Sequence, residues 1–234
     1  MKRVWIAGLL AAAVIVPAAR TADDENPAKE ALQALNEFIG SWKGAGGNQS
    51  KSENWKENFS WTWKFKGGDP SMLVEFKGSK NFDKGVLRYL PEKKKYELTV
   101  TDKDGAEQVF VGELKKKFLT LDRADGKSGE TYRLTINTAA EGLRFIYTYS
   151  RKAKGSTIFT KLYEVASNKE GESLAGGVKQ KECVITGGLG TIAVSYNGKT
   201  YYVCCTGCRD AFKEDPERYI KEYEERQKAK EKDR

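Results

Sequence analysis

The feature that most constrains the fold of this chain is an alternation of apolar and polar residues with a period of two, repeated in many runs from Trp55 to Val165. Successive side chains of a β-strand point to opposite faces of a sheet, so each run predicts a strand with one buried face. Turn signals such as Asp125-Gly126 and Glu141-Gly142 separate the runs. Short strands joined in this way predict a mainly β, antiparallel meander. We expect it to close as a barrel, with a sandwich as the alternative, because closure leaves no unpaired edge.

The N-terminal residues have the pattern of an export signal. Lys2 and Arg3 precede an apolar run from Val4 to Val16, and small residues follow that run. The run is too short to span a bilayer, so we assign residues 1–22 to a secretory signal peptide. We therefore expect a secreted or periplasmic protein, with no integral membrane span after cleavage of the signal.

Two domains are expected after the signal. Residues 27–166 form the β-barrel domain, which begins with a short helix predicted from Pro27 to about Phe38. Residues 167–180, SNKEGESLAGGVKQ, are polar and rich in glycine, so they predict a flexible linker. Residues 181–226 form a small α+β module, in which a hairpin turns at Asn197-Gly198 and a helix follows. We expect the helix to break or restart at Pro216 and to fray after about residue 227.

Charge and the lack of histidine limit the function. The formal net charge is +8, but the lysines are mixed with acidic residues in segments such as PEKKKYE and QKAKEKDR. This mixing is typical of solvated faces, and we expect no nucleic-acid partner. The chain has no histidine. That excludes Ser-His-Asp and Cys-His catalysis, histidine-ligated haem and every metal site that uses an imidazole. We expect a protein that is not an enzyme.

All four cysteines fall in the C-terminal module, and they are Cys183, Cys204, Cys205 and Cys208. The first precedes the predicted hairpin, the vicinal pair ends its second strand, and the last begins the helix, whose N-terminus stabilises thiolates. This corner can bring three or four sulfurs around one ion. Four cysteines in an oxidising compartment can instead form two disulfides, and Cys205-x2-Cys208 has the spacing of a redox pair. Metal binding is favoured over disulfides, and redox catalysis is least favoured because no base accompanies the thiols.

The segment from Cys183 to Ile220 resembles a YHS domain of the wider TRASH group of treble-clef-like metal-binding modules. The resemblance rests on one cysteine followed after about twenty residues by Cys-x3-Cys, here Cys183, Cys204 and Cys208. An aromatic residue and an Asp-Pro-x-x-Tyr helix follow, here Phe212 and Asp215 to Tyr219. Cys205 occupies a position at which the family varies. The resemblance implies the handling of heavy metals, often copper or zinc.

The start of the predicted barrel resembles the lipocalin-like (calycin) barrels. The segment FIGSWKGAGG carries Gly40-x-Trp42 after a short helix and before a meander. The resemblance implies that Trp42 closes one end of the barrel and packs on a late basic residue. It also implies a barrel of the kind that binds a small apolar ligand. A nitrobindin-like barrel would bind haem through a histidine, and without one we expect no haem.

From these observations we expect a non-catalytic protein in which Cys183, Cys204 and Cys208 hold zinc or copper, with Cys205 as a candidate fourth ligand. The segment YYVCC predicts a continuous strand, whose adjacent side chains diverge, so we expect Cys205 to stay outside the site. In the alternative, the cysteines form structural disulfides and the barrel binds a small apolar molecule. A thiol oxidoreductase is the least favoured function.

Overall fold

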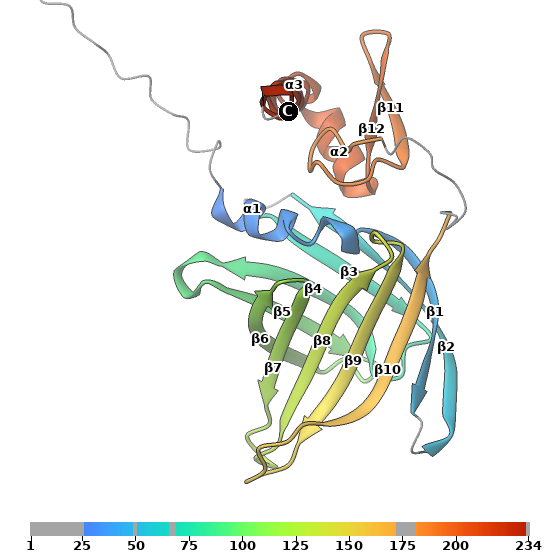
Figure 1. Ribbon diagram of the computed structural model, residues 1–234, viewed down its shortest axis with the longest axis vertical. Coiled ribbons are helices and arrows are strands. Elements are labelled where there is room, and N and C mark those ends of the chain that lie inside the picture. The colour runs from blue at the N-terminus through green and yellow to red at the C-terminus, as the bar shows by residue number, and fades with distance from the viewer. Residues whose placement is uncertain (1–25, 49–50, 66–68, 172–180, 233–234) are drawn as a thin grey trace, which may run out of the picture.

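The computed structural model describes residues 26–48, 51–65, 69–171 and 181–232. The predicted signal peptide and residues 172–180 of the predicted linker lie outside these ranges. The described chain is mainly β and consists of a closed antiparallel barrel followed by a smaller cysteine module (Figure 1). The prediction of a barrel is therefore confirmed, whereas the lipocalin-like label is not.

Ten strands form the barrel, and each pairs with its neighbours in the sequence. The barrel closes where β1 pairs with β10, at contacts such as Gly44 opposite Ser167. The strands are β1 (Gly40–Asn48), β2 (Glu53–Lys64), β3 (Ser71–Lys77), β4 (Phe82–Leu90), β5 (Lys95–Asp102), β6 (Glu107–Lys115), β7 (Phe118–Ala124), β8 (Thr131–Ala139), β9 (Arg144–Lys152) and β10 (Thr160–Lys169). A short 3-10 helix, η3 (Pro91–Lys93), joins β4 to β5. β10 runs beyond the predicted boundary at residue 166, because Ser167 continues the alternation and is buried.

The alternation seen in the sequence fills the barrel with side chains. Along β2, Phe59, Trp61 and Trp63 are buried and the residues between them are more exposed. The remaining cavity in the barrel is lined by aromatic and aliphatic side chains, and its volume is about 20 Å³. That is about the room that a single water molecule needs. Around this cavity, the described part of the interior is packed with side chains.

One end of the barrel is covered by the N-terminal helical segment. The α1 helix (Pro27–Gln33) begins at Asn26, whose side chain accepts hydrogen bonds from the amides of Ala28 and Lys29. It leads into the 3-10 helix η1 (Asn36–Phe38) and contacts β3 and β4. Figure 1 shows α1 between the barrel and the cysteine module. This segment forms the rim on which the module packs.

Trp42 closes this end of the barrel, which is the position that the resemblance of the segment FIGSWKGAGG implied. Its side chain is fully buried, and its indole Nε1 donates a hydrogen bond of 2.8 Å to the Phe38 carbonyl. The Lys169 ammonium lies 5.1 Å from the centre of the indole ring and supplies the late basic partner. Trp42 is therefore a core residue.

Glu57 is a buried acid at the far end of the barrel, away from the cysteine module. Its carboxylate accepts a hydrogen bond of 2.8 Å from Trp55 Nε1 and a short one from the Tyr147 hydroxyl. Burial raises the pKa of Glu57, and these hydrogen bonds oppose the rise only in part.

The cysteine module consists of a hairpin and two helices, β11 (Ile192–Tyr196), β12 (Lys199–Val203), α2 (Thr206–Glu214) and α3 (Pro216–Lys232). The hairpin turns at Asn197 and Gly198, which both have positive φ, as predicted. The helix restarts at Pro216, also as predicted. However, α3 continues beyond the predicted boundary at residue 226, because Gln227 and Lys230 contact the Glu182 carboxylate at 2.9 and 2.6 Å.

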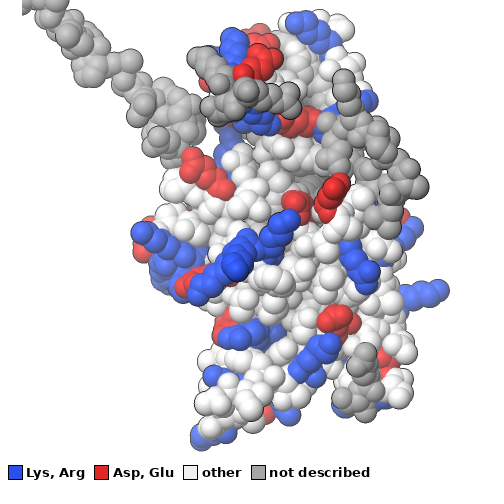
Figure 2. Space-filling model, viewed as in Figure 1, with Lys and Arg blue, Asp and Glu red and all other residues white. Residues whose placement is uncertain are grey.

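Charges of both signs are mixed on the surface seen in Figure 2, over the barrel as well as the module. Several of them form partly exposed ion pairs, such as Lys95 with Glu113 and Arg133 with Asp122. Judged by length and hydropathy, the helices in the described part of the chain include none suited to spanning a bilayer.

Candidate metal centre

Three of the four cysteines that were predicted as metal ligands lie close together. The sulfurs of Cys183, Cys204 and Cys208 all lie within 4.8 Å of one another, and those of Cys204 and Cys208 are 3.4 Å apart. All three side chains are buried, Cys183 and Cys208 completely. None of the four cysteines forms a disulfide. The module therefore brings three thiols together compactly, and we call Cys183, Cys204 and Cys208 the thiol cluster.

Each sulfur comes from a different local structure. Cys183 opens a tight turn, in which its carbonyl accepts from the Gly187 amide at 2.9 Å and its amide donates to the Gly188 carbonyl at 2.6 Å. Cys204 follows the end of β12, and Cys208 lies in the first turn of α2. The Val184 amide donates to the Tyr202 carbonyl, which ties the turn to the hairpin. These contacts bring a residue about twenty positions upstream to the strand–helix corner.

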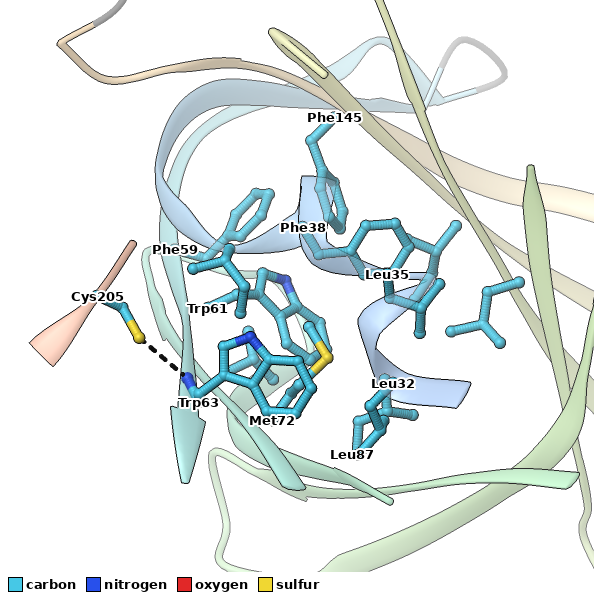
Figure 3. Close-up of a cluster of buried hydrophobic side chains, with 14 of the residues drawn as sticks. Leu32, Leu35, Phe38, Phe59, Trp61, Trp63, Met72, Leu87, Phe145 and Cys205 are labelled. Carbon is cyan, nitrogen blue, oxygen red and sulfur yellow. Dashed lines mark hydrogen bonds between the residues drawn. The ribbon is translucent and has the colours of Figure 1, made fainter. Parts of the chain in front are cut away.

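Cys205 lies outside the thiol cluster and has another partner. Its sulfur accepts a hydrogen bond of 3.3 Å from the backbone amide of Trp63 in β2 (Figure 3). The reason given from the sequence was incomplete, because β12 ends at Val203 and does not continue to Cys205. The backbone at Cys205 is nevertheless extended, with φ −159° and ψ 174°. Its sulfur is not one of the three that lie within 4.8 Å of one another, although it still interacts with the thiols of Cys204 and Cys208.

Shared hydrogen bonds and burial shift the pKa values of the three thiols in different directions. Hydrogen bonding from Cys204 lowers the pKa of Cys183, whereas burial raises the pKa of Cys208. The pKa of Cys204 is raised, first by its hydrogen bond to Cys183. A second buried negative charge in such a cluster is costly without a cation nearby. The thiol cluster therefore favours a positively charged partner.

A small apolar core holds the thiol cluster in place. Val184, Ile185, Val203 and Phe212 are buried around the sulfurs, and the Phe212 ring packs on Tyr201 with centroids 5.7 Å apart. The Arg226 guanidinium donates to the Val184 carbonyl at 2.7 Å and so ties α3 to the Cys183 turn. Cys183 and Cys208 are thereby fully shielded from water, whereas Cys204 lines a pocket at the junction with the barrel rim.

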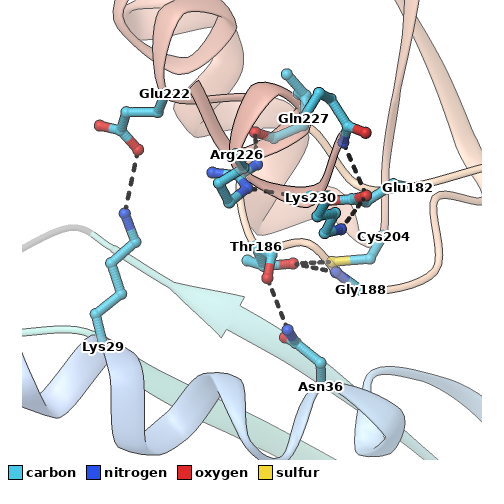
Figure 4. Close-up of polar contacts among 11 residues, drawn as sticks. Lys29, Asn36, Glu182, Thr186, Gly188, Cys204, Glu222, Arg226, Gln227 and Lys230 are labelled. Carbon is cyan, nitrogen blue, oxygen red and sulfur yellow. Dashed lines mark hydrogen bonds and ion pairs between the residues drawn. The ribbon is translucent and has the colours of Figure 1, made fainter. Parts of the chain in front are cut away.

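The module packs on the rim of the barrel through a small set of polar contacts (Figure 4). Asn36 Nδ2 donates to the Thr186 carbonyl at 2.7 Å, and the Thr186 hydroxyl lies 3.5 Å from Cys204 Sγ. Farther along, Lys29 of α1 pairs with Glu222 of α3 at 3.4 Å. The thiol cluster is thus two side-chain contacts from the barrel.

Gly207 allows the closest approach between the two parts. A Cβ atom at this position would lie 1.8 Å from the backbone carbonyl oxygen of Trp63, a distance that no real contact adopts. Only glycine lets the first turn of α2 pack against the end of β2.

Sequence reasoning missed the residues through which the barrel reaches the thiol cluster. Asn36, Trp63 and Thr186 carry no motif, and the first two were assigned only to a helix and a strand. Their contacts with the module join residues separated by more than a hundred positions. No signal in the sequence marks such a pairing.

Comparison with known families bears on the same module. The model of the YHS domain matches residues 191–223. The cysteine module contains a YHS domain. The matched range includes Cys204, Cys205 and Cys208, while Cys183 lies upstream of it and joins them only in the folded YHS module.

Comparisons over the whole chain say less. A search of curated proteins gives no match. Among solved structures, the crystal structure of Rv2717c from M. tuberculosis is similar with 16% sequence identity and a TM-score of 0.38, covering 60% of this chain and 97% of that one. The barrel is established by its own strand pairing.

Proposed function

We propose that this chain is a non-catalytic metal-binding protein in which the thiol cluster of the YHS module holds a soft metal ion, zinc or copper. The observation that carries the proposal is the convergence of three buried sulfurs within 4.8 Å of one another. The YHS match over residues 191–223 supports it independently.

The donor set fits a thiophilic ion. Sulfurs bound at about 2.3 Å to one zinc ion lie roughly 3.8–4.0 Å apart, and the spacing in the thiol cluster is of this order. Thiolates select Cu(I) and Zn(II) over Mg(II) and Ca(II), which prefer oxygen ligands. With no histidine in the chain, sulfur is the only soft donor that this module offers. Three thiolates suit Cu(I), whereas Zn(II) usually takes a fourth ligand.

The alternative function, binding of a small apolar molecule inside the barrel, has less support. A cavity of about 20 Å³ is far smaller than the 300–1,000 Å³ typical of ligand pockets. The oxidoreductase alternative also has less support, because the Cys205 sulfur accepts a hydrogen bond from the Trp63 backbone amide of the barrel. The export pattern of residues 1–22 supports a secreted or periplasmic location, where such a protein would bind metal outside the cytoplasm.

The test is elemental analysis of the full chain, exported with its own N-terminal segment and purified without added metal. We expect about one zinc or copper ion per chain, and loss of that ion in Cys183→Ser, Cys204→Ser and Cys208→Ser. Retention in Cys205→Ser would assign three ligands, and its loss would add a fourth. A metal-free wild-type protein with fewer than four free thiols would refute the proposal and favour disulfides.

A further inference from the structure

The end of β2 reaches the YHS module at the point where its own sheet partner stops. β1 begins at Gly40, which is opposite Trp61, so the β1 ladder does not extend to Trp63. The backbone amide of Trp63 donates instead to Cys205 Sγ at 3.3 Å. A sulfur of the module thereby satisfies a buried amide of the barrel, which would otherwise lack a partner at considerable cost.

The side chain of Trp63 makes a second connection, through Asn36. The indole Nε1 donates to Asn36 Oδ1 at 3.2 Å, and Asn36 Nδ2 donates to the Thr186 carbonyl at 2.7 Å. The Thr186 hydroxyl lies 3.5 Å from Cys204 Sγ. Asn36 also lies close to Gly188, where an added Cβ would be 3.1 Å from the Asn36 Cβ. The amide is thus held from both sides.

The contacts of Asn36 and Trp63 bear on two of the three cysteines in the thiol cluster, Cys183 and Cys204. Thr186 lies in the turn that Cys183 opens, so a fixed Thr186 carbonyl also fixes the backbone that carries Cys183. The same residue contacts Cys204 directly through its hydroxyl. On the other side, Trp63 holds Cys205, whose neighbour in the chain is Cys204.

We propose that Asn36 and Trp63 are positioning residues of the metal centre, so that the barrel completes the site instead of serving as a separate ligand container. This inference rests on the proposed function of the thiol cluster. Partners that orient metal ligands typically change metal affinity by 10–100-fold when they are removed. Metal binding and the contact of the module with the rim are linked reciprocally. If the rim contacts raise the metal affinity, then a bound metal must strengthen those rim contacts by the same factor.

The experiment compares two asparagine substitutions in the full chain. Asn36→Ala removes the link to Thr186, whereas Asn81→Ala removes a comparable side-chain bond, from Asn81 Nδ2 to the Tyr163 hydroxyl, at the far end of the barrel. We expect Asn36→Ala to lower the affinity for Zn(II) at least tenfold in competition with a chelator, and Asn81→Ala to leave it unchanged. If Asn36→Ala does not fold, Asn36→Asp keeps the acceptor for Trp63 and loses only the donor to Thr186.

Two further readouts separate positioning from a general loss of stability. With Co(II) as the probe ion, the sulfur-to-cobalt charge-transfer band should shift in Asn36→Ala and not in Asn81→Ala. In metal-free, reduced protein, Asn36→Ala should raise the rate at which a thiol reagent labels Cys204 and Cys205. Equal affinity, band position and labelling in the two variants would overturn the inference. Faster labelling of Asn36→Ala in a chain that binds no metal would overturn only the metal function and leave the rim contact standing.

Discussion

Substitution of Gly207 by alanine tests the contact between the barrel and the YHS module, because helix propensity and the structure predict opposite effects on stability. Alanine is the better helix former by up to about 1 kcal/mol, so helix propensity alone predicts that Gly207→Ala stabilises α2. The structure predicts the reverse, because the new Cβ would lie 1.8 Å from the carbonyl oxygen of Trp63. That oxygen belongs to a paired strand and cannot rotate aside.

The size of the effect follows from the distances. To reach an acceptable separation of 3.0 Å, α2 and β2 must move apart by about 1.2 Å. A displacement of this size lengthens the contact between the Trp63 amide and Cys205 Sγ from 3.3 Å to about 4.5 Å, beyond hydrogen-bonding range. Overpacking of this kind costs about 1–3 kcal/mol, so after the gain in propensity we expect a net destabilisation of about 1–2 kcal/mol.

Gly126→Ala provides the matched control. Gly126 lies in a turn with no atom within 4 Å of the added Cβ and with no positive φ to forbid alanine. We expect Gly207→Ala to lower the melting temperature by about 2–8 °C and to speed thiol labelling of Cys205, while Gly126→Ala does neither. A Gly207→Ala protein as stable as the wild type, with Cys205 equally protected, would show that the close approach does not exist in solution.

Three further predictions concern the core, the thiol cluster and a buried acid. Trp42→Ala should lower the free energy of unfolding by about 3–5 kcal/mol, because it removes a fully buried indole and leaves the Phe38 carbonyl unpaired; an unchanged urea midpoint would contradict this. Cys208→Ser should lose the metal and unfold the YHS module while the barrel remains folded, because so small a core needs its sulfurs. Metal content and circular dichroism measure the two effects, and an intact module in the reduced, metal-free variant would rule the prediction out. Burial raises the pKa of Glu57 in the folded state, so its contribution to stability is present below the unfolded pKa and is lost as the pH rises through the folded value. Glu57→Gln should therefore gain stability relative to the wild type as the pH rises above the unfolded pKa, and melting curves of the two proteins that stay parallel with pH would refute the assignment.

The sequence predicted those parts of the fold that depend on local pattern. The alternation in runs such as FSWTWKFKG indicates strands directly, and the Asn197-Gly198 turn marks the hairpin. The three cysteines of the thiol cluster were found because thiols are few in this chain and their spacing is distinctive. For Cys205, the position outside the metal site stays a prediction, and β12 ends earlier than the sequence predicted.

The remaining features depend on residues far apart in the chain. The end of α3 was expected to fray because it has no apolar face, but Lys230 is held by Glu182, a contact that helical periodicity does not encode. In the same way, nothing near Asn36 indicates that its amide meets Thr186. Polar contacts across domains depend on how two finished surfaces meet, and a pattern within either segment gives no information about that.

The pairing of β1 with β10 also determines the order in which the chain can fold. Gly44 must meet Ser167, so the barrel has two unpaired edges until almost the whole of its sequence is available. Contacts this distant in sequence form slowly, because the entropy of closing a long loop is lost before the paired strands gain their contacts. The rim that receives the YHS module comes from residues near the start of this barrel, while Cys204 and Cys208 are synthesised after all of it. During synthesis, the barrel can therefore close before the last two sulfurs of the thiol cluster have been added to the chain, and the module then meets a rim that is already formed.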